Sequence, residues 1–176
     1  MIDPNQVQHI NIKIFVENPS AIDLADAIPV FHNWIKNSVC DEMLVDVADY
    51  RHVPAGPGVL LIGHQANYSL DHREGRLGLL YNRKDALPGT FRDRLNQAFG
   101  AALRATELLE DEPPFRGKLK FNRALTEVFV NDRLLAPNTD ETWQALKPAI
   151  QEYFPGCVLE RRGEPRDLFR VSATTR

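Results

Sequence analysis

Residues 63–76 carry the densest group of side chains that could do chemistry: two imidazoles, one phenol, two carboxylates, two amides and two guanidinium groups. Functional side chains in sheet proteins often gather in loops at strand ends, and a bare turn does not need so many polar groups. His64 directly follows an apolar stretch, and an imidazole can act as a general acid or base near neutral pH. We therefore predict three catalytic candidates, with Asp71 orienting the ring of His64 and Tyr68 donating to a developing negative charge.

A binding function without catalysis is our first hypothesis for the same segment. Together with a turn predicted at residues 49–58, it would form a polar cleft for a small polar or anionic ligand or for a partner chain. Our candidate ligand-binding residues are His32, Asp46, His52, Asn67, Arg73 and Arg76. His32 borders the apolar face of a predicted helix, and Asp46 is an alternative to Asp71 as the partner of His64.

The alternative hypothesis is an enzyme that uses His64 in acid/base chemistry without a cofactor. The chain has no Gly-x-Ser-x-Gly sequence, no Walker A loop and no dinucleotide fingerprint, so we expect no organic cofactor. Side chains that could supply metal ligands are present, but the sequence lacks HxH and HExxH spacing, so we predict no metal site. The residues in question are Asp49, His52, His64, Asp71 and His72.

The charge of the chain argues against two classes of partner. The net charge is −3, whereas binding to nucleic acid or to an anionic membrane requires many uncompensated basic residues. Residues 1–50 hold eight acidic and two basic side chains, a charge of −6, and the remaining residues carry +3. This asymmetry would suit complementary faces in a homodimer, which we expect.

The location of the protein is predicted from its cysteines and its hydropathy. Cys40 and Cys157 lie far apart and form no CxxC pair, so we expect both to be reduced. The sequence shows neither a secretory signal nor an apolar run approaching about 18 residues. We therefore expect a cytoplasmic protein that does not bind membranes.

Periodicity predicts eight strands and three helices within one domain, residues 1–176. The clearest strand is 9–16, where Ile10, Ile12, Ile14 and Val16 alternate with more polar side chains. The other predicted strands are 43–48, 59–62, 77–81, 119–121, 127–130, 157–162 and 168–173. Helices are predicted over 21–38, 90–109 and 138–154, with capping pairs Ser20 and Asp23, Thr90 and Asp93, and Asn138 and Glu141. For the first helix, Pro29 leaves open a later start capped by Asp26.

The resulting order is β-α-β-β-β-α-β-β-α-β-β. Several connections are too short for parallel crossovers, so we predict an α+β fold with a mostly antiparallel or mixed sheet packed against three helices. A further hypothesis is a homo-oligomeric interaction protein, with Phe15 beside Tyr81 or Phe169 on an exposed apolar sheet face.

Overall fold

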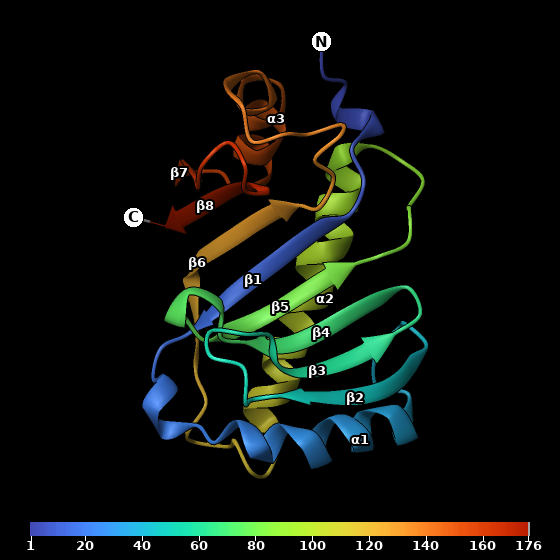
Figure 1. The fold of residues 1–176 in the computed structure, drawn as a ribbon, viewed down its shortest axis with the longest axis vertical. Coiled ribbons are helices and arrows are strands. Elements are labelled where there is room, and N and C mark those ends of the chain that lie inside the picture. Colours follow the sequence, from blue (N-terminus) through green and yellow to red (C-terminus); the bar gives the residue numbers. More distant parts are fainter. Residues whose placement is uncertain (176) are drawn as a thin grey trace.

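Eight strands form one antiparallel sheet in the computed structural model, which describes residues 1–175 (Figure 1). Their order is β2-β3-β4-β5-β1-β6-β8-β7. The strands are β1 (Ile10–Val16), β2 (Leu44–Tyr50), β3 (Gly58–Gly63), β4 (Ala66–Asp71), β5 (Gly78–Arg83), β6 (Phe121–Val130), β7 (Cys157–Arg162) and β8 (Phe169–Thr175). The α-helices of the described residues are α1 (Ala27–Asn37), α2 (Phe91–Asp111) and α3 (Asp140–Tyr153). The predicted α+β class is confirmed.

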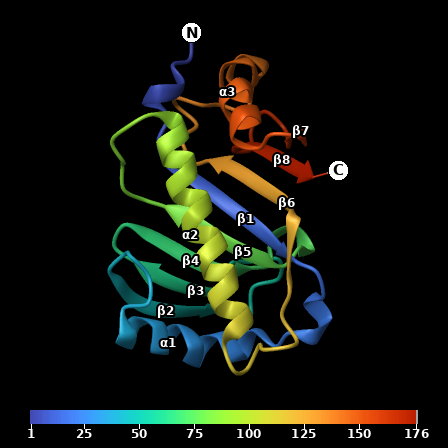
Figure 2. The ribbon, with the colours of Figure 1, turned by 180° about the vertical axis from the view of Figure 1, so that it is seen from behind.

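The helices leave one face of the sheet open. The long helix α2 crosses the other face, against β1 and β5 (Figure 2). Helix α1 packs beside β2 and β3 at one end of the sheet, and α3 packs beside β7 and α2 at the other. Over residues 1–175, no α-helix lies across the face that is turned to the viewer in Figure 1. Among the same residues, none of the helices has both the length and the apolar composition needed to cross a membrane.

Strand β1 is buried on both of its faces. Ile10, Ile12 and Ile14 face the helix side and belong to the hydrophobic core, as their alternation predicts. The alternate side chains of β1, including Lys13 and Phe15, lie on the open face and are nevertheless buried as well. The open face must therefore be covered over β1 by something other than an α-helix.

The segment 63–76, which we expected to be a loop, contains strand β4. Only the two residues His64 and Gln65 separate the end of β3 from the start of β4. Ala66, Tyr68 and Leu70 face the core and alternate with polar side chains on the open face. The two-residue alternation typical of a strand was thus present in the sequence. We interpreted the segment as a functional loop because every second residue is polar.

Two other predictions about strands need correction. The predicted strands 119–121 and 127–130 are replaced by the single strand β6, which pairs with β1 through a register shift between Ile14 and Phe15. Such a shift inserts extra residues into one strand, which breaks the alternation that identifies a strand in the sequence. The predicted pairing of Phe15 with Tyr81 or Phe169 is also wrong, because these two aromatic rings belong to the core on the helix side.

Side-chain caps begin α2 and α3, whereas the predicted cap pair Ser20 and Asp23 does not begin α1. Asp23 instead caps a short 3-10 turn that precedes α1. Helix α2 begins with the predicted capping box, in which Thr90 and Asp93 each accept a hydrogen bond from the other's backbone N–H. Helix α1 starts at Ala27, so Pro29 lies in its first turn, where its missing N–H costs no helical hydrogen bond. Helix α3 is capped by Thr139 and not by Asn138. The Asn138 amide instead donates to the carbonyl oxygens of Arg162, at the end of β7, and of Glu164, in the β7–β8 loop.

Candidate functional site

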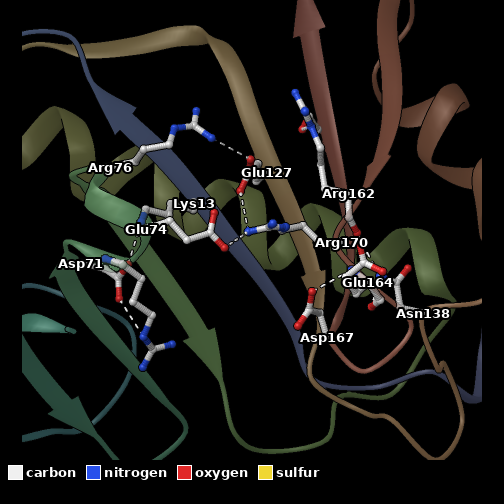
Figure 3. Close-up of polar contacts among 12 residues, drawn as sticks. Lys13, Asp71, Glu74, Arg76, Glu127, Asn138, Arg162, Glu164, Asp167 and Arg170 are labelled. Carbon is white, nitrogen blue, oxygen red and sulfur yellow. Dashed lines mark hydrogen bonds and ion pairs between the residues drawn. The ribbon is translucent and has the colours of Figure 1, made fainter. Parts of the chain in front are cut away.

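A cavity of about 100 Å³ lies on the open face of the sheet. Strands β1, β4, β5, β6 and β8 contribute to it, together with the turn between β4 and β5 and the residue just before β8. Its apolar wall consists of Phe15, Leu80, Phe129 and Leu168, and Asn11 is its uncharged polar member. Its charged lining consists of Lys13, Asp71, Arg73, Glu74, Arg76, Glu127 and Arg170. Figure 3 labels all of these except Arg73.

A buried ion pair forms one side of this cavity. The Lys13 ammonium on β1 donates to Asp71 Oδ1 on β4 over 2.7 Å, and the two side chains are 5% and 1% exposed. Strand β5 lies between them, and its residue Gly78 leaves room for the lysine to cross. A β-carbon at Gly78 would lie 3.0 Å from Lys13 Cε and 2.7 Å from the carbonyl oxygen of Ile14.

The β4–β5 turn covers the cavity and explains why β1 is buried on both faces. Glu74 and Gly75 have the positive φ angles of 59° and 67°, which fold the turn back over the sheet. Glu74 accepts a hydrogen bond of 2.8 Å from Arg170 on β8, and Arg76 donates to Glu127 on β6 over 3.2 Å (Figure 3). The Arg76 guanidinium also stacks 3.8 Å from the ring centre of Phe15.

The β7–β8 loop completes the wall. Asn138 holds this loop through its two hydrogen bonds of 2.9 and 3.1 Å, and the Glu164 N–H donates to Asp167 Oδ2 over 2.7 Å. These bonds fix the chain just before β8, where Leu168 contributes its side chain to the cavity. Figure 3 shows this loop beside Arg170.

The charges of the cavity do not balance. Its lining holds four basic and three acidic side chains, which leaves one positive charge. The Lys13 ammonium has three N–H donors, but within the described residues it makes a single hydrogen bond, to Asp71. Arg76 and Arg170 each have five guanidinium donors and, over residues 1–175, each uses one of them. The cavity can therefore offer several N–H donors to an anion.

Three of the residues predicted from the sequence meet in this cavity: Asp71, Arg73 and Arg76. The predicted catalytic group is not brought together. His64 is exposed in the β3–β4 turn, at the opposite end of β4 from Asp71. Tyr68 faces the core on the other side of the sheet.

The other predicted residues lie outside the cavity. The Asn67 side chain accepts a hydrogen bond from the N–H of Gly63, and Asp46 on β2 accepts one from the N–H of its neighbour Val47. His52 is exposed and stacks on Tyr50, and His32 is exposed on α1. Residues 49–58 therefore contribute none of the cavity's lining.

Sequence reasoning missed Lys13, Glu127 and Arg170, which lie on three different strands. Lys13 and Arg170 are each the one charged residue of their strands, and Glu127 is followed by three apolar residues in β6. That pattern is the available signal, because a charge is rarely buried unless it is paired or functional.

A second buried polar cluster lies on the helix side of the sheet. The buried Glu42 carboxylate accepts hydrogen bonds from the hydroxyls of Tyr68 and Tyr81, over 2.7 and 2.8 Å. Gln97 on α2 donates to the Tyr81 oxygen over 2.9 Å. The Tyr68 hydroxyl is thus committed to Glu42, and burial raises the pKa of the nearby Cys40 thiol to about 12. This cluster joins the segment before β2 to the sheet and to α2.

We expect this cluster to make the protein lose stability at alkaline pH. Burial raises the pKa of Tyr68 and of Tyr81 above the ordinary value of 10.0. Above about pH 10 the unfolded chain therefore releases these two protons while the folded chain keeps them, and each tyrosine lowers the free energy of unfolding by about 1.4 kcal/mol per pH unit. Urea unfolding at about pH 8, 10 and 11 measures this slope. The variant Tyr68→Phe should have a shallower slope than the wild type, and equal slopes would contradict the prediction.

No protein-family model, curated protein or solved structure matches this chain, so the comparisons assign it neither a family nor a function. Among residues 1–175, no group of three or more His, Cys, Asp or Glu side chains is placed to hold a metal ion.

Proposed function

We propose that this chain is a binding protein that holds a small anion in the cavity of the open sheet face. The observation that carries the proposal is the Lys13 ammonium, which is 5% exposed and, within residues 1–175, has one hydrogen-bond acceptor for its three donors. Burying a charge costs several kcal/mol unless its donors are satisfied. An anion in the cavity would accept from the unused donors and would balance the extra positive charge.

The two arginines beside Lys13 support the same proposal. Arg76 is held in place by Glu127 and by the ring of Phe15, so its orientation is set before a ligand arrives. A preorganised guanidinium loses little side-chain entropy when it binds a carboxylate or a phosphate. Arg170 forms ion pairs with Glu74 over 2.8 Å and with the buried Glu127 over 3.9 Å. The Glu74 side chain is more than half exposed and can turn away from Arg170. An incoming anion would then take the place of Glu74 beside Arg170.

Thermal unfolding in the presence of small monoanions tests the proposal. Formate, acetate and glycolate are compared with chloride at equal ionic strength, because a ligand that binds only the folded state raises the Tm in a saturable way. We expect at least one of these anions to stabilise the wild type and the stabilisation to disappear in Arg76→Gln. Glu74→Gln should bind the same anion several-fold more tightly, since it removes the nearer of the two carboxylates that pair with Arg170.

The control variant is Lys36→Gln, which removes one positive charge from the exposed surface of α1, away from the cavity lining. It should bind like the wild type. Equal stabilisation of Arg76→Gln and Lys36→Gln, or no saturable stabilisation by any of the anions, would refute the proposed site.

Catalysis by His64, a homodimer and a cytoplasmic location stay predictions of the sequence. The exposed position of His64 in a two-residue turn gives catalysis no further support.

A further inference from the structure

One carboxylate oxygen of Asp71, a residue of the cavity lining, lacks a hydrogen bond within residues 1–175. Asp71 Oδ2 is buried, and within residues 1–175 it accepts none. The other oxygen, Oδ1, accepts from the Lys13 ammonium and from the Arg73 N–H. The guanidinium Nε of Arg73 lies 3.4 Å from Oδ2 as an ion pair, on a side chain that is 60% exposed. A buried carboxylate oxygen without a hydrogen bond is costly, so this position favours a ligand that brings a donor.

The residues that line the cavity therefore include an unpaired acceptor and unused donors from different elements. Asp71 lies on β4, whereas the unused donors belong to Lys13 on β1, to Arg76 in the turn and to Arg170 on β8. Figure 3 shows Asp71 and Arg170 on opposite sides of Lys13. A ligand that satisfies both sides needs an anionic group and a hydrogen-bond donor in one small molecule.

Size and charge narrow the class of ligand. A cavity of about 100 Å³ is smaller than the roughly 150 Å³ that accommodates benzene in an apolar protein interior, so it suits roughly five non-hydrogen atoms. The single excess positive charge is balanced by a monoanion, whereas a zwitterion would leave it unbalanced. Phe15 and Phe129 in the wall favour a ligand that also has a carbon framework.

We propose that the ligand is a small hydroxy monocarboxylate. Its carboxylate accepts hydrogen bonds from Lys13, Arg76 and Arg170, and its hydroxyl donates to Asp71 Oδ2 at the place that the exposed Arg73 side chain now occupies. This inference rests on the proposed anion-binding function and adds the requirement for a donor.

Calorimetric titration of the full chain with three matched monoanions tests the donor requirement. Glycolate carries a hydroxyl, acetate has a hydrogen in its place, and fluoroacetate has a fluorine of similar size that cannot donate. We expect glycolate to bind about tenfold or more tightly than either of the others, since each of them leaves the buried acceptor unpaired. Glycine, which has a donor but no net charge, should bind more weakly than glycolate.

A second readout ties the preference to Asp71. In Asp71→Asn, the preference for glycolate over acetate should fall below about threefold, because the amide has both a donor and an acceptor to offer. The comparison of ligands on the wild type stands by itself if this variant does not fold.

The possible results separate the two proposals. Equal binding of all three carboxylates, with loss in Arg76→Gln, overturns the donor requirement and leaves anion binding intact. Tighter binding of inorganic phosphate than of glycolate overturns the hydroxycarboxylate assignment. Absence of binding by every probe overturns both proposals.

Discussion

Replacing Lys13 by methionine will lower the free energy of unfolding by about 3–5 kcal/mol, because it leaves the buried Asp71 carboxylate with only the exposed Arg73 side chain as an ion-pair partner. Asp71 is 1% exposed and cannot recover its charge partner from solvent without a change of structure. For a domain of this size, the loss corresponds to a decrease in Tm of roughly 10 °C. Urea and thermal unfolding of the two proteins measure the difference.

The double variant Lys13→Met with Asp71→Asn will recover most of this loss. It contains no unpaired buried charge, and the asparagine oxygen can still accept the Arg73 N–H that Asp71 accepts now. Lys120→Met is the matched control, because Lys120 forms a 3.3 Å ion pair with Glu17 at the exposed surface, where such pairs contribute at most about 1 kcal/mol. If Lys13→Met lowers the free energy of unfolding no more than this control does, the buried pair of Lys13 and Asp71 is not strongly coupled.

This double variant also separates stability from function. If it is as stable as the wild type but no longer binds anions, the buried charges are not required for folding. The free energy spent on burying them is then explained by their role in binding the ligand. Natural proteins often carry such locally unfavourable groups at functional sites.

Replacing Glu42 by alanine will destabilise the protein by about 3 kcal/mol or more, since it removes two hydrogen bonds to a charged group. The hydroxyls of Tyr68 and Tyr81 then lose the acceptor that both of them use, in a region from which water is excluded. The segment before β2 also loses one of its attachments to the sheet, while the hydrogen bonds of Met43 to His64 and Gln65 remain. Urea unfolding measures the change, and the loss of compact packing should be visible in near-ultraviolet circular dichroism.

Two further variants check this explanation. Glu42→Gln keeps an oxygen that can accept from one tyrosine, so it should lose less stability than Glu42→Ala. Adding Tyr68→Phe and Tyr81→Phe to Glu42→Ala should restore part of the loss, because the unpaired hydroxyls are then absent. A triple variant less stable than Glu42→Ala alone would show that the cost comes from the lost volume of Glu42 and not from its hydrogen bonds.

Local patterns in the sequence were sufficient to predict several elements of the fold. The alternation of Ile10, Ile12 and Ile14 predicted β1, and the spacing of Thr90 and Asp93 predicted where α2 begins. Both patterns depend on neighbouring residues, because strand pleating repeats every two residues and a capping box spans one helical turn. The α+β class, with a mostly antiparallel or mixed sheet, followed from the short connections.

The candidate site could be predicted only in part. Asp71, Arg73 and Arg76 were identified because they lie in one polar segment, and the same density of polar groups concealed strand β4. His64 and Tyr68 share that segment, but the turn and the strand place one in solvent and the other in the core. A prediction based on closeness in the sequence therefore included residues that line the cavity and residues that lie elsewhere.

Only the tertiary structure decided which charges meet. Lys13 and Asp71 are 58 positions apart, Arg76 and Glu127 are 51 apart, and Glu74 and Arg170 are 96 apart. The order of the strands and their register bring these residues together, and a shift of one residue would move each side chain to the opposite face of the sheet. The sequence by itself determined the elements because their signals are local, whereas the cavity depends on pairings between distant strands that no local pattern records.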